Sequence, residues 1–225
     1  MNAPAACLFD LDGLLLDTEP CHARAWREAA LQFGLRLEDE QLLSLRGRRR
    51  HDCVAQVQAW LEQSGRMPPT AADLLAVQQP IARRLLPDAP AMLGAPQLIE
   101  RCDALRLPMA LVTSSSSEAV AFKTAGHPWL ERIELRIHGD DPALAAGKPA
   151  PDPFLLAAAR LGVPASACWA FEDSPAGARA AGLAGCQVHV LLPPEIGEEE
   201  RRRLYDPHWR FLNSLEELLI ELPEP

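Results

Sequence analysis

The chain has 225 residues, of which 48% are hydrophobic, and its formal net charge is −9. This length and hydrophobic share suit one large domain, or one domain with an insertion. The negative charge argues against nucleic acid or an anionic membrane surface as a partner, because both attract basic proteins.

The first predicted element is a buried strand from Ala5 to Phe9, an apolar run that ends at Asp10 and Asp12. In an open α/β sheet, ligands bind just beyond the carboxyl ends of the strands. Two carboxylates at such a place are costly unless a metal ion or a reacting group uses them. Gly13 would let the backbone turn sharply there. We interpret the two aspartates as part of a site, the alternative being that they only begin a turn.

A long region without strand signals follows, from about Leu15 to Pro90. Its apolar residues recur at helical spacing, and glycines and prolines interrupt the pattern several times. The region is therefore predicted to be a small bundle of helices.

Beyond Pro90 the pattern changes to helices that alternate with short apolar strands. The strands are expected at Met109–Val112, Glu134–His138, Cys168–Phe171 and Val188–Leu191. The helices are expected at about Ala95–Leu107, Pro153–Leu161 and Pro175–Leu183. Such alternation indicates βαβ units and a parallel sheet. We predict an α/β protein with a doubly wound parallel sheet, a Rossmann-like core of residues 1–15 and 91–225, and an inserted helical cap domain of residues 16–90.

Polar residues follow three of the predicted strands. Besides the two aspartates of the first strand, they are Thr113, Ser114 and Ser115 after the second and Glu172 and Asp173 after the strand from Cys168. Hydroxyls and backbone N–H groups at a helix start form an anion site, although simple capping of the helix by serine is an alternative. Clustered carboxylates with room for water suit Mg²⁺.

Lysine is scarce in this chain, where Lys123 and Lys148 are the only two. Lys148 lies near a predicted strand end, in a loop that prolines restrain. A cation fixed there would offset the repulsion between the carboxylates and hold a phosphate as a point charge. The alternative is a solvated loop lysine.

Together these segments resemble the motifs of the haloacid dehalogenase superfamily of phosphotransferases. The first motif, D-x-D-G-x-x-x-D, corresponds to Asp10–Asp17, and the second, a strand ending in Thr or Ser, to Thr113-Ser114. The lysine motif corresponds to GKPAPDPF and the acidic motif to FEDSPAG. The four motifs occur in order over nearly the whole chain, and the helical insertion lies where members with a small type-1 cap carry theirs.

The resemblance implies a role for each motif residue. Asp10 would be the nucleophile that becomes an aspartyl phosphate, and Asp12 the general acid and then the general base. The second aspartate also argues against a dehalogenase, since members that remove halide lack it. The implied ligands of Mg²⁺ are Asp10, the backbone carbonyl of Asp12, and Asp173, with Glu172 nearby. The implied phosphate-binding residues are Thr113, Ser114, Ser115 and Lys148, the last also counted as catalytic.

Two subgroups compete for the substrate. The segment Asp17–Trp26, which includes His22, and the G-x-x-R ending at Arg50 resemble beta-phosphoglucomutase, and imply that Arg50 contacts a distal phosphate. That family also presents a cap lysine, which the stretch from Leu15 to Pro90 lacks. The core domain, above all HGDDPALAAGKPAPDPF, resembles pseudouridine-5'-phosphatase and related sugar-phosphate phosphatases.

We therefore expect a Mg²⁺-dependent phosphatase acting on a small phosphorylated sugar or nucleotide-like metabolite. A phosphosugar mutase and a non-catalytic phosphometabolite-binding protein are the alternatives. His22 is expected either to contact Asp12 or to pack at the hinge of the cap. We also expect a cytoplasmic location, because the first residues carry no basic segment followed by a long apolar one, and no apolar stretch reaches the ~18 residues of a membrane span. A monomer is expected as the default for a capped member of the family.

Overall fold

A computed structural model describes residues 3–194 and 196–222, and in this part of the chain six strands form one sheet. The strands are β1 (Ala6–Phe9), β2 (Met109–Val112), β3 (Leu135–Ile137), β4 (Cys168–Glu172), β5 (Gln187–Leu191) and β6 (Arg210–Leu212). Their order is β3-β2-β1-β4-β5-β6, and every neighbouring pair is parallel. This order is that of the doubly wound sheets, with its reversal between β1 and β4.

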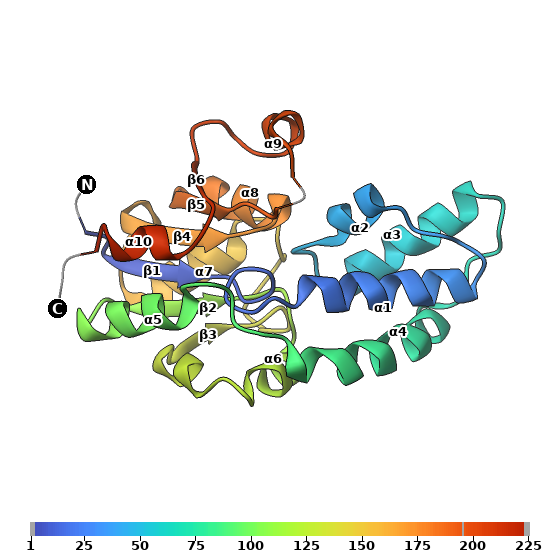
Figure 1. The fold of residues 1–225 in the computed structure, drawn as a ribbon, viewed down its shortest axis with the longest axis horizontal. Coiled ribbons are helices and arrows are strands. Elements are labelled where there is room, and N and C mark those ends of the chain that lie inside the picture. The colour runs from blue at the N-terminus through green and yellow to red at the C-terminus, as the bar shows by residue number, and fades with distance from the viewer. Residues whose placement is uncertain (1–2, 195, 223–225) are drawn as a thin grey trace.

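Five α-helices come between β1 and β2 in the chain, and we call the first four the helical insertion: α1 (Glu19–Gln32), α2 (Asp39–Leu45), α3 (Arg50–Gln63) and α4 (Ala71–Leu85). The other helices are α5 (Ala95–Ala104), α6 (Ser117–Thr124), α7 (Asp152–Leu161), α8 (Pro175–Leu183), α9 (Glu198–Leu204) and α10 (Glu216–Leu219). Short 3₁₀ turns occur at Leu86–Asp88, Pro128–Arg132 and Ala165–Ala167. Figure 1 shows the insertion as a separate lobe beside the sheet.

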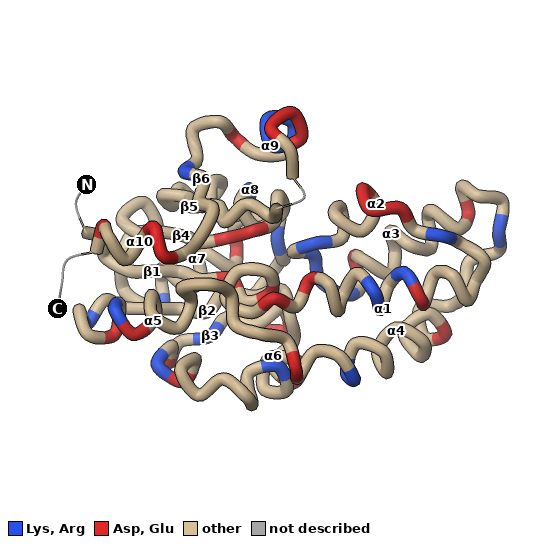
Figure 2. Tube along the Cα trace, viewed as in Figure 1, with Lys and Arg blue, Asp and Glu red and all other residues tan. Residues whose placement is uncertain are grey.

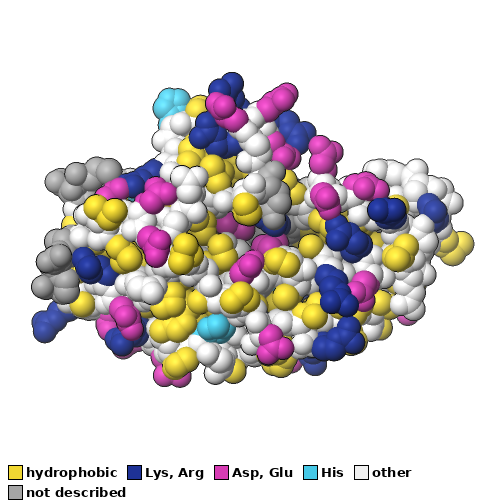
Figure 3. Space-filling model, in the orientation of Figure 1, with side chains coloured by type: hydrophobic (Ala, Val, Ile, Leu, Met, Phe, Trp, Pro, Cys, Tyr) yellow, Lys and Arg dark blue, Asp and Glu magenta, His cyan; other side chains and the backbone are white. Residues whose placement is uncertain are grey.

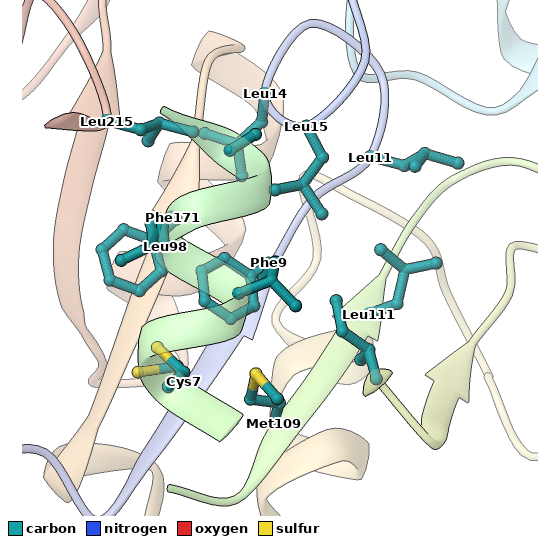
Figure 4. Close-up of a cluster of buried hydrophobic side chains, with 14 of the residues drawn as sticks. Cys7, Phe9, Leu11, Leu14, Leu15, Leu98, Met109, Leu111, Phe171 and Leu215 are labelled. Carbon is teal, nitrogen blue, oxygen red and sulfur yellow. The ribbon is translucent and has the colours of Figure 1, made fainter. Parts of the chain in front are cut away.

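Helices cover both faces of the sheet, because its strands are apolar on both sides. In β1, alternate side chains point to opposite faces. Cys7 and Phe9 belong to one core, which they share with Leu98 of α5, as Figure 4 shows. Leu8 belongs to a second core with Phe154 of α7. The predicted α/β fold with a doubly wound parallel sheet is thus confirmed.

The helical insertion has a hydrophobic core of its own. Trp26 of α1, Leu42 of α2, Leu61 of α3 and Leu74 of α4 are buried together there. Helices α1 and α4 pack side by side and bring the two ends of the insertion back to the sheet. Separate cores support the division into two domains, whose limits at residues 15 and 90 stay a prediction.

The structure corrects three details of the predicted elements. The helix that begins at Ala95 ends at Ala104, and β3 is shorter than expected. The strand β6 had not been predicted at all: it has three residues and lies at the sheet edge, with Arg210 and Phe211 only half-buried. So short a segment shows no hydrophobic period that a sequence pattern could reveal.

The charge distribution of the surface and the character of the helices concern two partners that the composition argues against, nucleic acid and membranes. In the view of Figure 3, acidic and basic side chains are interspersed, so the negative charge is not gathered into one patch on that face. Among the helices that the structure describes, none has both the length and the apolar character required to cross a membrane.

Candidate active site

The predicted site residues meet at the carboxyl edge of the sheet, where the strand order reverses. Asp10 follows β1, Thr113 follows β2, and Glu172 with Asp173 closes β4. A cavity of about 890 Å³ lies over this edge, with Asp10 and Asp12 on one wall and residues of α1–α4 on the other. Doubly wound sheets bind ligands at this kind of position.

Lys148 forms the centre of a buried ion network. Its side chain has no exposed surface, and it donates hydrogen bonds to Asp10 Oδ1, to Glu172 Oε1 at 2.5 Å and to the backbone carbonyl of Val112 at 2.7 Å. Although burial opposes it, the charges of Asp10 and Glu172 raise the pKa of Lys148 above its ordinary value. The prediction that this lysine compensates the carboxylates agrees with the geometry, and a solvated loop lysine is excluded.

The surroundings of Asp10 contain more negative charge than Lys148 alone can balance. Burial, followed by the charges of Glu172 and Asp12, raises the pKa of Asp10 to about 7 despite Lys148. Burial and the charges of Glu19 and Asp10 raise the pKa of Asp173 well above its usual range. A further cation in contact with these carboxylates would reverse both shifts.

Asp173 supplies the observation that a metal ion would explain. Both its carboxylate oxygens are buried and have no hydrogen-bond partner among the residues that the structure describes. Oxygens of Asp10, Glu172 and Asp173 lie within 4.8 Å of one another. Gly13 lets the chain approach closely: its φ is +84°, and an added Cβ would lie 2.2 Å from Asp173 Oδ2. An all-oxygen set of this charge fits Mg²⁺.

Close contacts fix the conformation of the serine-rich turn after β2. The Thr113 hydroxyl accepts a hydrogen bond from the Ser115 N–H at 3.1 Å, and Ser116 caps α6. A Cβ on Gly139 would lie 2.1 Å from the carbonyl oxygen of Ser114, so only glycine fits against this turn. The Ser114 hydroxyl donates to the carbonyl of Gly47 at 2.8 Å, which joins the turn to the helical insertion. Capping thus falls to Ser116, leaving the residues predicted to bind phosphate free of that role.

Asp12 has a partner that the sequence analysis overlooked. Lys123 of α6 is 1% exposed and donates to both carboxylate oxygens of Asp12, at 2.6 and 2.7 Å. Burial alone would raise the pKa of Asp12, but Lys123 and His22 hold it well below its usual range. His22 Nε2 lies 3.4 Å from Asp12, so of its two expected roles the contact with Asp12 is confirmed. The only earlier signal for Lys123 was the scarcity of lysine.

The helical insertion contributes basic residues to the other wall of the cavity. Four of them lie on and beside the α2–α3 connection, which Figure 2 shows next to the acidic strand ends: Arg46, Arg48, Arg49 and Arg50. Arg46 pairs with the buried Glu19 at 3.3 Å, a contact that the sequence analysis also missed. Burial nevertheless raises the pKa of Glu19 to about 8. Arg50 lies on the cavity wall, where the prediction of a substrate contact places it.

Comparison with known proteins gives the same assignment as the site geometry. A family model described as haloacid dehalogenase-like hydrolase matches residues 4–185. The probable pseudouridine-5'-phosphatase of Drosophila melanogaster is 34% identical over 86% of this chain and 84% of its own length. The fructose-1-phosphate phosphatase YqaB of Escherichia coli is 35% identical over 83% of this chain and 97% of its own.

Solved structures are similar over the whole length. CbbY from Rhodobacter sphaeroides, in complex with xylulose-(1,5)bisphosphate, superposes with a TM-score of 0.78 at 28% identity, covering 97% of this chain and 99% of that one. The match to the family model extends over most of the chain, and the two relatives exceed 30% identity. The chain therefore belongs to the haloacid dehalogenase-like hydrolases, as its four motifs indicate.

Proposed function

We propose that this protein is a Mg²⁺-dependent phosphatase that hydrolyses a small phosphorylated sugar or nucleotide-like metabolite through an aspartyl phosphate on Asp10. The observation that carries the proposal is a buried carboxylate in contact with Lys148 and grouped with the unpartnered oxygens of Asp173. A carboxylate can approach an anionic phosphate ester only where cations compensate the repulsion. Membership of a hydrolase family argues against a protein that only binds a phosphometabolite.

The reaction would proceed in two displacements at phosphorus. An oxygen of Asp10 attacks the phosphorus, the bond to the substrate oxygen breaks, and Asp12 gives that oxygen a proton. Water then attacks the aspartyl phosphate, its proton goes to Asp12, and the bond from phosphorus to Asp10 breaks with its electron pair returning to the carboxylate. The products are an alcohol and inorganic phosphate.

The remaining residues would hold the phosphoryl group. The carboxylates of Asp10 and Asp173, the backbone carbonyl of Asp12 and the nearby Glu172 would hold Mg²⁺. When bound, this ion neutralises charge on the phosphoryl oxygens. The groups proposed to bind those oxygens are the Thr113–Ser115 turn and Lys148.

The substrate class rests on the cavity and on the relatives. A cavity of about 890 Å³ accommodates a small metabolite. The names of two relatives state that they act on pseudouridine 5'-phosphate and fructose 1-phosphate, both phosphorylated sugars or nucleosides. We propose that Arg50 and His22, which line the cavity, contact the part of the substrate beyond the phosphate.

A phosphosugar mutase remains the second candidate. The position of Arg50 on the cavity wall favours it, because an arginine there could bind a second phosphate. The absence of any lysine from Leu15 to Pro90 disfavours it. Formation of hexose 6-phosphate from beta-glucose 1-phosphate, dependent on a bisphosphate primer, would identify a mutase.

The test of the proposed function is a panel of phosphorylated metabolites assayed for phosphate release with Mg²⁺. It should include pseudouridine 5'-phosphate, several sugar phosphates and an aryl phosphate. We expect steady turnover of at least one metabolite, silenced by EDTA, restored by Mg²⁺ and abolished in a folded Asp10→Asn variant. Near-normal turnover in that variant would contradict the assignment of the nucleophile. Arg50→Ala should raise KM for the metabolite more than for the aryl phosphate, whereas Arg24→Ala, on an exposed face of α1, should change neither.

A cytoplasmic location and a monomeric state stay predictions. Size-exclusion chromatography with light scattering tests the second directly.

A further inference from the structure

The segment between β5 and β6 leaves the sheet and returns beside the proposed metal site. It contains α9, all of whose residues the structure describes and none of which is buried. Figure 1 shows α9 standing apart from the sheet, and Glu200 of this helix lines the cavity. Tyr205, which directly follows α9, is by contrast only 3% exposed. The chain is therefore anchored to the core at the point where it returns from α9.

The side chain of Tyr205 is fixed at both its ring and its hydroxyl. The ring packs edge-on against Trp209 and Phe211, with ring centroids 6.5 and 6.1 Å away. The hydroxyl donates a hydrogen bond to the backbone carbonyl of Asp173 at 2.7 Å. A buried tyrosine hydroxyl normally has a hydrogen-bond partner. Here the partner belongs to the residue whose carboxylate is proposed to hold Mg²⁺.

Asp173 depends on its backbone for its orientation. Its two carboxylate oxygens are buried and accept no hydrogen bond from the residues that the structure describes. The neighbouring Ser174 is fixed by its own hydroxyl, which donates to Glu172 Oε2 at 3.1 Å and accepts from the N–H of Gly177 at 3.0 Å. The hydroxyl of Tyr205 reaches the carbonyl of Asp173 itself. The direction of the free carboxylate thus follows from the backbone position that these two hydroxyl groups maintain.

We propose that Tyr205 is a positioning residue of the metal site, which fixes the backbone of Asp173 so that its carboxylate stays beside those of Asp10 and Glu172. The inference rests on the proposed function, because it takes these three carboxylates as the place where Mg²⁺ binds. Residues that orient metal ligands from outside the ligand set typically change metal affinity 10- to 100-fold. Tyr205 lies outside the four motifs, so no motif indicates it.

The identity of the metal ion supplies a readout that separates positioning from general loosening of the fold. Mg²⁺ requires nearly ideal octahedral geometry, whereas Ca²⁺ accepts irregular arrangements of its oxygen ligands. A carboxylate that is slightly displaced should therefore weaken the binding of Mg²⁺ more than that of Ca²⁺. A loss of stability without such a displacement should leave the ratio of the two affinities as it is in the wild type.

The test is the variant Tyr205→Phe, which keeps the ring and removes only the hydroxyl. Isothermal titration of EDTA-treated protein with Mg²⁺, and separately with Ca²⁺, needs no substrate and no turnover. We expect the Kd for Mg²⁺ to rise about 10-fold and the Kd for Ca²⁺ to rise less.

Two further variants serve as matched controls. Ser64→Ala also removes a hydroxyl that donates to a backbone carbonyl, that of Leu61 at 2.7 Å, but it lies at the end of α3 in the helical insertion. Both affinities should be unchanged in it. Phe211→Leu, at the half-buried edge of the sheet, keeps the hydroxyl of Tyr205 but removes one of the two rings beside it. It should weaken Mg²⁺ binding less than Tyr205→Phe does, and it still measures the effect if that variant does not fold.

The outcomes that overturn the inference differ from those that overturn the proposed function. An unchanged Kd for Mg²⁺ in Tyr205→Phe, or an equal rise for Mg²⁺ and Ca²⁺, would show that the hydroxyl does not position Asp173. If Tyr205→Phe does not fold, an unchanged ratio of the two affinities in Phe211→Leu would show the same. If the wild type binds no Mg²⁺, the metal site of the proposed function is wrong and the inference fails with it. If it binds Mg²⁺ with the expected dependence on Tyr205 but releases no phosphate from any substrate of the panel, only the proposed function fails.

Discussion

The binding of Mg²⁺ should depend strongly on pH, because protons and the metal ion compete for the same carboxylates. Burial and neighbouring charge raise the pKa of Asp10 to about 7, and that of Asp173 well above its usual range. A group with a pKa near 7 is ionised in roughly one molecule in eleven at pH 6 and in half of them at pH 7. Affinity for Mg²⁺ should therefore rise about five-fold over this unit from Asp10 alone, and further from Asp173.

Isothermal titration of EDTA-treated protein at pH 6 and pH 7, at constant ionic strength, measures this rise. Titration in two buffers with different ionisation enthalpies should show protons released at pH 7. Asp173→Asn should abolish binding, whereas Glu62→Gln, a change of the same kind on the exposed face of α3, should leave both the affinity and its pH dependence intact. Equal affinity at the two pH values would refute the reasoning that places the ion among these carboxylates.

Three further predictions concern the structure around the site. Burial lowers the pKa of His189 from 6.5 to about 4, so between these values the unfolded chain binds a proton that the folded chain does not. The free energy of unfolding should therefore fall by about 2 kcal/mol from pH 7 to pH 5 through this group, and urea unfolding of His189→Phe should lack that part of the loss. Gly139→Ala should lower kcat/KM about 10- to 100-fold, because its Cβ would displace the turn at Ser114, while Gly197→Ala, with open space around it, should change nothing; equal kinetics of the two variants would contradict this. Leu61→Ala should cost about 2–5 kcal/mol and speed hydrogen exchange in α1–α4 but not in the sheet, if the helical insertion is a separate domain; uniform acceleration would count against the division.

The sheet could be predicted because its central strands are buried on both faces. Segments such as Ala6–Phe9 and Met109–Val112 are continuous apolar runs, and each is followed by a polar residue that lies in the site. The edge strand β6 offered no such run, since its three residues, of which only Leu212 is fully buried, carry too little pattern. A hydrophobic period is visible only where side chains are buried, and the side chains of this edge strand are mostly not fully buried.

The site could be predicted only as far as its residues follow strands or belong to motifs. Asp10, Lys148 and Asp173 came from those two signals. Lys123 reaches the site from the side of a helix, and the apolar pattern of α6 does not indicate which face turns inward. The pairing of Glu19 with Arg46 joins the start of α1 to the end of α2, which is a contact between separate helices that no local pattern encodes.

The most direct test of the central claim is to locate the phosphoryl group during turnover. Wild-type enzyme mixed with Mg²⁺ and a substrate from the panel should be quenched in acid within one turnover, digested and analysed by mass spectrometry. We predict one phosphoryl group on Asp10, labile to hydroxylamine and absent from Asp10→Asn. Release of phosphate by an enzyme whose Asp10 stays unmodified at every quench time would contradict the account.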